Sequence, residues 1–308
     1  MAARPIFGTL EATVAPHEGS AHFSVLADYW TLTKPEVNFL IVVTTFAGFY
    51  LGWPSGDFPA LRCMNTVLGT LLVASGTGTL NQYIERSFDA QMRRTARRPV
   101  AAGRLKPKSA LWFGIALSIF GTVYLAAAVN LLSSALALGT LLSYLFFYTP
   151  LKRKSPLCTL IGAFPGATPP LIGWAAASGG LSLGAWILYA VLFLWQFPHF
   201  MSIAWMYRED YARAGYLVLP HDKRTRAGVV NWQSVLPLLA LFPVSFWPDL
   251  TSTSGTIYCV AATLLCAGFL YYGVRFAFQK SNSSARQLLL ASIFYLPLLF
   301  GLMILTRV

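Results

Sequence analysis

The chain has 308 residues, of which 56% are hydrophobic and only 11% are charged. Soluble domains carry about a quarter of their residues as charged side chains, so this chain lacks the polar surface that a soluble globule of its size needs. The composition excludes a soluble enzyme, a disordered protein and a disulfide-rich scaffold. It predicts an all-α polytopic membrane protein.

The charge is lopsided, with 23 Lys and Arg residues against 11 Asp and Glu residues and a net charge of +12. A basic excess of this size has two interpretations, a nucleic-acid partner or basic loops that orient membrane spans. The positions of the basic residues relative to the apolar stretches distinguish the two.

Residues 1–30 are expected to form an amino-terminal tail. This segment has no apolar run of signal-peptide length. It has one arginine, Arg4, and its acids include Glu11 and Glu18, whereas a mitochondrial transit peptide is rich in arginine and poor in acids. The tail is therefore expected to lie in the cytoplasm. A bacterial cell (inner) membrane is favoured over the mitochondrial inner membrane.

Nine apolar stretches follow in a membrane domain that covers residues 31–308. Each is about long enough to cross a hydrocarbon core of ~30 Å as a helix. We expect the spans near residues 37–53, 65–85, 109–129, 131–149, 157–177, 185–206, 231–249, 256–278 and 288–306. The third and fourth nearly touch at Asn130, which predicts a tight hairpin between them.

The basic residues fall almost entirely on one side of these spans. With the amino terminus in the cytoplasm, 21 of the 23 lie in the tail and the cytoplasmic loops, and only Arg62 and Arg307 lie on the other side. This bias is the positive-inside pattern of membrane proteins. It supports nine spans and removes nucleic acid as an expected partner.

The fifth span is unusually rich in helix breakers, which are Gly162, Pro165, Gly166, Pro169, Pro170 and Gly173. One interpretation is a set of kinks that packed helices tolerate. The other is a broken helix that lines a cavity, because irregular backbone at membrane depth must face protein or water.

Asn81, Glu85 and Asp89 are spaced four residues apart at the cytoplasmic end of the second span. On a continuous helix they stack on one face, about 6 Å per step, and three such oxygen-bearing side chains suit a hard cation such as Mg2+. Arg93 and Arg97 extend the spacing and would hold phosphoryl oxygens beside the metal. The alternative is a capped helix end followed by a basic loop.

Glu209 and Asp210 form a second acidic pair, at the cytoplasmic end of the sixth span. Four spans separate the two acidic clusters, which hints at a weak two-fold repeat. Two facing clusters bind a polyphosphate through more than one metal ion. The alternative is a local Arg–Asp salt bridge.

His199 lies inside the sixth span, some two turns before the second acidic pair. A histidine at membrane depth is a functional candidate by default. It could ligate an iron, act as a base, or bond a carbonyl that Pro198 frees, and the sequence favours none of these.

Together these segments resemble the UbiA-type membrane prenyltransferases and, within that superfamily, the haem branch of protoheme IX farnesyltransferases (haem O synthases). The resemblance covers residues 30–220 in register. It rests on Leu32–Val37, Asn81–Asp89 with Met92–Thr95 and Arg98–Pro99, Tyr148–Arg153, Gly162–Ala167, Pro169–Trp174, Trp195–Phe200, Tyr207–Gly215 and Leu219–Pro220. The Trp195–Phe200 run with Asp210–Gly215 is typical of the haem branch.

This resemblance implies a bundle of nine transmembrane helices around a central cavity and a Mg2+-dependent transfer of farnesyl from farnesyl diphosphate to a vinyl group of haem B. The metal set that it implies is Asn81, Glu85, Asp89, Glu209 and Asp210. The candidate diphosphate-binding residues are Arg93, Arg94, Arg97, Lys152 and Arg153, and His199 is the candidate haem-binding residue.

The chain departs from the superfamily pattern at two positions. Many relatives have Asp-x3-Asp as the second motif, but Met206 stands four residues before Asp210. The metal role of the second pair is therefore less secure than that of the first. Glu36 also stands where a basic residue is expected after Lys-Pro, which puts a phosphate role for that turn in doubt.

Two other functions compete with farnesyl transfer to haem. The nearer one is a UbiA-type enzyme that prenylates an aromatic quinone precursor, and the run around His199 argues against it. The distant one is a transporter, which would need ionisable groups near the midplane, whereas the acids here cluster at one face.

The expected partners are haem B, farnesyl diphosphate and the lipid bilayer, with a haem A synthase or a terminal oxidase assembly downstream.

Overall fold

The computed structural model describes residues 24–220, 222–246 and 255–306, and over these residues the secondary structure is helical. The helices in chain order are α1 (Val25–Leu32), α2 (Pro35–Gly52), α3 (Ala60–Asp89), α4 (Pro107–Ala128), α5 (Leu131–Ser143), the π-helix η1 (Tyr144–Tyr148), α6 (Thr149–Leu151), α7 (Cys158–Gly166), α8 (Pro169–Ser178), α9 (Leu183–Met206), α10 (Arg208–Arg213), α11 (Lys223–Ser245), α13 (Gly255–Gln279) and α14 (Asn282–Leu305). The prediction of an all-α chain is confirmed.

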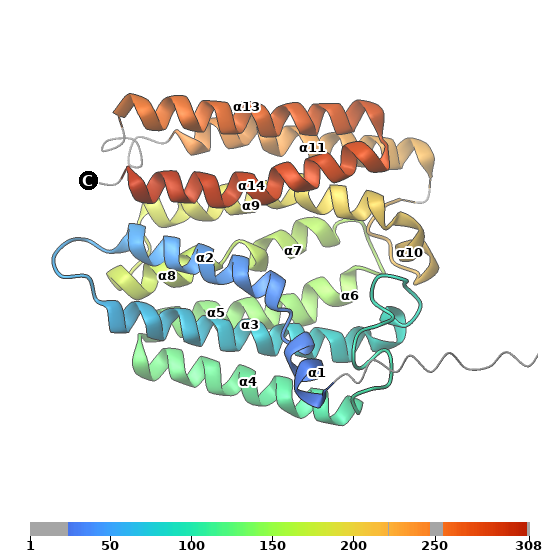
Figure 1. Ribbon diagram of the computed structural model, residues 1–308, viewed down its shortest axis with the longest axis horizontal. Helices are drawn as coiled ribbons and strands as arrows, with labels where there is room; N and C mark the ends of the chain where they lie inside the picture. The colour runs from blue at the N-terminus through green and yellow to red at the C-terminus, as the bar shows by residue number, and fades with distance from the viewer. Residues whose placement is uncertain (1–23, 221, 247–254, 307–308) are drawn as a thin grey trace, which may run out of the picture.

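The long helices run side by side along the long axis of the molecule (Figure 1). Among the residues that the structure describes, seven helical segments are long and apolar enough to span a membrane. They are 35–52, 107–128, 131–151, 183–206, 223–245, 256–279 and 282–305. α3 lies among them but is more polar, and α7 and α8 are each too short, so the count of nine spans stays a prediction. Most of the predicted tail and residues 247–249 of the seventh predicted span lie outside the described residues.

The fifth predicted span is broken into two helices. α7 ends at Gly166 and α8 begins at Pro169. Proline suits the first turn of a helix because it has no backbone N–H, and an N–H at that position would have no partner within the helix. α8 packs closely on α2, because a Cβ at Gly48 or at Gly173 would overlap backbone of the facing helix. Of the two interpretations of this span, the broken helix is confirmed.

The basic connections gather at one end of the bundle. The loops after α3 and α6, helix α10 and the turn before α14 all lie at the right-hand end of Figure 1. Buried Asp28 on α1 accepts bonds of 2.8–3.1 Å from the Arg104 guanidinium, which ties α1 to the loop after α3 at this same end. The polar end of the bundle is therefore braced by side-chain ion pairs.

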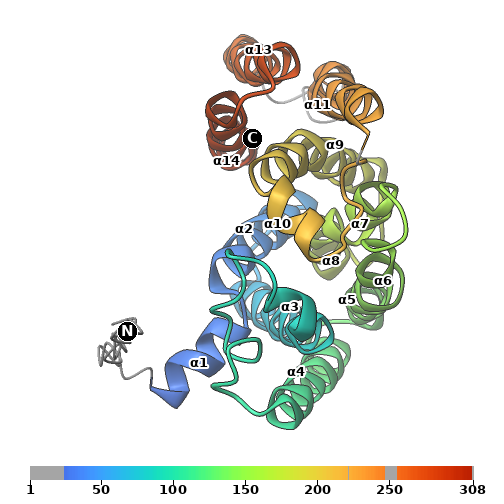
Figure 2. The ribbon, with the colours of Figure 1, turned by 90° about the vertical axis from the view of Figure 1, so that its right-hand side faces the viewer.

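The carboxyl-terminal helices α11 and α14 pack on α9, and α13 packs on α11 and α14, around a large apolar core (Figure 2). The indole Nε1 of buried Trp195 on α9 donates to the Ser292 carbonyl of α14 at 2.8 Å. On the other side of α9, the Gln196 amide donates to the Ala163 carbonyl of α7 at 3.2 Å. α9 thus joins the carboxyl-terminal helices to the rest of the bundle.

Candidate functional site

The carboxyl-terminal end of α3 carries three buried oxygen-bearing side chains. The exposed fractions of Asn81, Glu85 and Asp89 are 1%, 5% and 1%, and α3 continues without a break to Asp89. The spacing of four residues therefore stacks them on one face of the helix. Burial of carboxylates at this depth is costly unless each one is paired.

Each of the three has a basic partner from a different segment. Lys34, between α1 and α2, donates from Nζ to Asn81 Oδ1 at 2.7 Å. Lys152, after α6, donates to the two Glu85 oxygens at 2.9 and 3.2 Å. Arg98, in the loop after α3, donates to Asp89 Oδ2 at 2.7 Å. The end of α3 is thus a ladder of three polar groups, each held by one cation.

The second acidic pair divides between the interior and the surface. Asp210 is buried, accepts the backbone N–H of Arg94 at 3.2 Å and pairs with Arg213 at 3.1 Å, so it joins α10 to the loop after α3. The Glu209 side chain is 81% exposed and lies 3.7 Å from Arg208. The structure brings Asp210 next to the loop that follows the first motif, and it leaves Glu209 at the surface.

The predicted diphosphate-binding residues are brought together only in part. Lys152 is in the ladder, and its Nζ lies 4.5 Å from the centroid of the Tyr148 ring. The Arg153 guanidinium lies over the Phe88 ring at 4.3 Å. Arg94 is exposed, and its guanidinium lies 5.2 Å from the centroid of the Tyr207 ring.

Arg93 and Arg97 do not continue the stack of α3. The expectation from their spacing is wrong because the helix ends at Asp89 and the chain then turns, with the Thr95 hydroxyl donating to the Asp89 carbonyl at 3.0 Å. Both arginines are exposed. Arg98, the residue after Arg97, contacts an acid of the ladder instead.

Lys34 is not among the site residues predicted from the sequence, although it lies in Leu32–Val37, one of the segments that carry the family resemblance. The residue has φ 56°, a left-handed conformation that is uncommon outside glycine and marks sites where structure over-determines the backbone. Proline pushes the residue before it toward extended backbone, so the position before Pro35 gave no signal for this left-handed conformation. The strained turn directs Lys34 into the ladder.

The two lysines of the ladder differ in their electrostatics. Burial and the nearby charges of Arg98 and Lys152 lower the pKa of Lys34 to about 7. Burial also disfavours the charged form of Lys152, but the Glu85 carboxylate outweighs it and holds the pKa of Lys152 well above its usual value. Lys152 is therefore a permanent cation, whereas the charge on Lys34 depends on pH.

The oxygen donors of the ladder fit a hard cation. Within the described ranges, no three His, Cys, Asp or Glu side chains are gathered into a ready-made metal cage, because lysine and arginine hold the acids instead. Asp89 Oδ1 is nevertheless buried without a hydrogen-bond partner. A buried, unpartnered carboxylate oxygen on the same helix face as an amide and a second carboxylate has the donor chemistry that Mg2+ requires.

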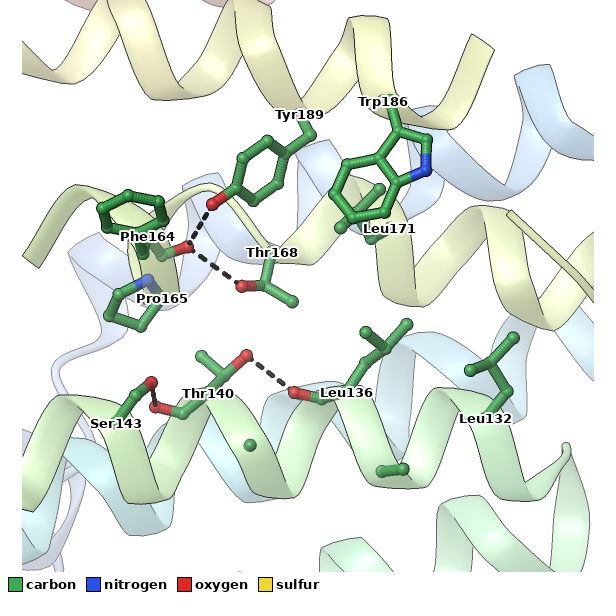
Figure 3. A pocket seen from close by; sticks show the side chains of 12 residues that line it. Leu132, Leu136, Thr140, Ser143, Phe164, Pro165, Thr168, Leu171, Trp186 and Tyr189 are labelled. Atoms are coloured by element: carbon green, nitrogen blue, oxygen red, sulfur yellow. Dashed lines mark hydrogen bonds between the residues drawn. The ribbon is translucent and has the colours of Figure 1, made fainter. Parts of the chain in front are cut away.

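A separate apolar pocket of about 390 Å³ lies between α5, α7, α8 and α9 (Figure 3). The break between α7 and α8 opens it, and the Phe164 carbonyl there accepts bonds from Tyr189 and Thr168 at 3.3 and 3.2 Å. Among the residues that line the pocket, Ser143 is the nearest to the ladder along the chain, nine residues before Lys152. That is about 13 Å of helix, and Tyr144 and Tyr148 of η1 lie on the chain between the two.

His199 lies on α9 and contacts α14. Its Nδ1 is 2.8 Å from the Ser292 hydroxyl, and its ring stacks on Trp195 with centroids 4.6 Å apart. The half-buried ring is seven residues, or about 10 Å of helix, before the end of α9. Its contacts are with Ser292, Trp195 and Phe200, none of which belongs to the ladder.

Comparison with known proteins yields one family. The model of the UbiA prenyltransferase family matches residues 41–299. Protoheme IX farnesyltransferase of Solibacter usitatus is 50% identical over 293 residues, which are 92% of this chain and 99% of that protein. The protein of the same name from Koribacter versatilis is 43% identical, over 95% of this chain and 96% of its own.

Solved structures share the fold at low sequence identity. A structure of digeranylgeranylglyceryl phosphate synthase superposes with a TM-score of 0.73 at 16% identity and covers 91% of this chain and 97% of its own. A UbiA homolog from Archaeoglobus fulgidus bound to GPP and Mg2+ gives 0.55 at 15% identity, over 90% and 99% of the two chains. These likenesses concern the arrangement of the helices.

Proposed function

Because the chain belongs to the UbiA prenyltransferase family, we propose that it is an integral membrane protoheme IX farnesyltransferase. It converts haem B, farnesyl diphosphate and water to haem O and diphosphate, and the new carbon–carbon bond joins C1 of the farnesyl group to a haem vinyl group. Identities of 38–50% over most of the chain to enzymes of that name support this substrate pair.

The observation that carries the proposal is the charge ladder at the end of α3. Three oxygen-bearing side chains and three cations meet there in a buried setting, at the end of the bundle where the basic loops gather. Farnesyl diphosphate carries a charged diphosphate group on an apolar tail. Such a substrate requires charged protein groups at the membrane surface and an apolar environment further inside the bundle. Basic groups neutralise the diphosphate, and an apolar bundle accommodates the isoprenoid chain.

We assign Mg2+ to Asn81, Glu85, Asp89 and Asp210, and we leave Glu209 out because its side chain faces away from the buried surface of α10. When bound, Mg2+ neutralises the diphosphate and makes it a better leaving group. Asp89 is the central ligand in this assignment because one of its oxygens has no other partner. A Mg2+-bound UbiA homolog with the same fold agrees with this choice of metal.

The cations of the ladder bind the diphosphate as it leaves. Lys34, Lys152 and Arg98 already stand beside the oxygen ligands, so the site is pre-organised for an anion. Arg94 and Arg153 reach the same end of the bundle from the loops after α3 and α6. Arg93 and Arg97 are exposed and would act only by attracting the anion from solution.

Loss of diphosphate leaves an allylic cation at C1, which aromatic faces stabilise. Tyr144 and Tyr148 lie next to the ladder with ring centroids 4.9 Å apart, on a π-helical turn of the kind that is frequent at functional sites. The vinyl group of haem attacks C1, and water adds to the resulting cation as a hydroxyl with release of a proton. This route needs no protein nucleophile.

The proposal extends to the surroundings of the enzyme. The domain of residues 31–308 lies in a bacterial inner membrane with its basic loops in the cytoplasm, and haem O passes to a haem A synthase or a terminal oxidase. Both substrates are amphiphiles with one charged end, so they reach the site from the bilayer.

The deciding experiment incubates the purified protein with haem B and farnesyl diphosphate, with and without Mg2+, and identifies the product by mass spectrometry. The expected product is haem B plus one farnesyl group and one hydroxyl group, formed only with Mg2+. An aromatic quinone precursor serves as the competing acceptor. Prenylation of that acceptor in place of haem would overturn the substrate assignment.

A further inference from the structure

A polar contact between α9 and α14 fixes the chemistry of His199. The Ser292 hydroxyl lies 2.6 Å from the Leu289 carbonyl and 2.8 Å from His199 Nδ1. A hydroxyl has one proton, and a carbonyl can only accept a bond, so Ser292 donates to Leu289. Ser292 must then accept from His199, which places the imidazole proton on Nδ1.

The other ring nitrogen is consequently an electron-pair donor. In a neutral imidazole with its proton on Nδ1, Nε2 carries a free lone pair. Among the residues that the structure describes, no donor bonds to Nε2. This is the state of a metal-binding histidine, which usually donates its second N–H to a fixed oxygen acceptor.

The neighbours of His199 give its direction. At 3.6 residues per turn, its side chain leaves α9 about 40° from Trp195 and about 60° from Gln196, between the two. Trp195 bonds to α14 and Gln196 to α7, so His199 projects between these helices. α2 lies on that side of α9, and α11 lies on the opposite side (Figure 2). His199 therefore faces the interior of the bundle.

We propose that Ser292 is a positioning residue that holds His199 with an unprotonated Nε2, and that Nε2 binds the iron of the haem substrate. The inference rests on the proposed function for the identity of the ligand. Trp195 supports the assignment because its stacked ring fixes the plane of the imidazole. The iron would then lie in the interior of the bundle, between α14 and α7.

The test measures iron ligation directly, in the full-length protein in lipid nanodiscs with haem B alone. The chain has four histidines, so the background variant carries His17→Gln, His22→Gln and His221→Gln. Resonance Raman spectra of the ferrous complex are expected to show an iron–histidine band in this background. His199→Ala should abolish the band, and added imidazole should restore it. A band that persists in His199→Ala overturns the proposal.

The role of Ser292 is tested by the same band and by haem affinity. Ser292→Ala is expected to weaken haem binding by about 10- to 100-fold and to shift the band, as loss of a partner of a metal-bound histidine does. Ser292→Thr keeps the hydroxyl and should restore both. Wild-type affinity and an unshifted band in Ser292→Ala would overturn the positioning role.

Trp195→Phe is the matched control. It removes the bond of Trp195 to the Ser292 carbonyl, which also joins α9 to α14, but keeps an aromatic ring beside His199. If it shifts the band as Ser292→Ala does, the effect comes from helix packing and the tautomer argument fails. Haem O formation, measured separately, distinguishes a failed inference from a failed function: an active protein without an iron–histidine band refutes only the inference.

Discussion

Both acidic motifs follow an apolar stretch of the sequence, yet their surroundings differ. Glu85 and Asp89 on α3 are both buried, and each is paired with a cation from another segment. On α10, Asp210 is buried but Glu209 is exposed. α3 is 30 residues long and packs along the bundle, whereas α10 has six residues and presents only one acid to the interior. Four-residue spacing keeps both acids on one helix face, and adjacent positions separate them.

The largest loss of activity is expected for Asp89→Asn. The amide removes the negative charge at a buried carboxylate whose Oδ1 has no hydrogen-bond partner, so the rate of haem O formation at saturating Mg2+ should fall by about 1000-fold. Product is measured by mass spectrometry. Thermal unfolding of the variant is the control, because Arg98 also loses its partner. A rate within tenfold of wild type would remove Asp89 from the metal site.

Glu85→Gln should reduce the rate by about 100-fold, because the substitution removes one charge and weakens the hold on Lys152. A double-mutant cycle with Lys152→Met separates the two causes. If Glu85 acts mainly through Lys152, the double variant is no slower than the worse single variant. Additive losses would show that each residue contacts the substrate or metal independently.

Asp210→Asn and Glu209→Gln form a matched pair on α10. Asp210 holds the backbone of Arg94 and pairs with Arg213, so its loss should slow the reaction by about tenfold. Glu209→Gln should stay within about twofold of wild type because its side chain is exposed. Equal losses in the two variants would contradict the division between buried and exposed acids.

The smallest effect is a dependence of substrate affinity on pH. The pKa of Lys34 is lowered to about 7, so its charge is present below that pH and lost above it. The KM for farnesyl diphosphate should therefore rise as pH increases above 7, by at most about tenfold per unit. Lys34→Arg keeps the charge at all these values and should flatten the profile. An unchanged profile in Lys34→Arg would assign the pH dependence to another group.

The sequence by itself determined the class of the molecule and the location of its charge. Low charge and long apolar stretches predict membrane helices because unpaired backbone and charge are costly in hydrocarbon. The spacing of Asn81, Glu85 and Asp89 was enough to place them on one helix face, since a continuous helix fixes that geometry locally. The dense helix breakers of the fifth span identified the irregular segment but left kink and break open.

The tertiary structure decided which groups meet. Lys34 and Asn81 are 47 residues apart in the chain, and Lys152 and Glu85 are 67 apart, so no local pattern predicts either bond. The end of α3 at Asp89 exposed Arg93 and Arg97 and turned Arg98 toward the acid, because the loop closes on Thr95. Ser292 fixes the protonated nitrogen of His199 from another helix. Long-range packing sets these contacts, and each decides the chemistry of a residue whose type alone leaves it undetermined.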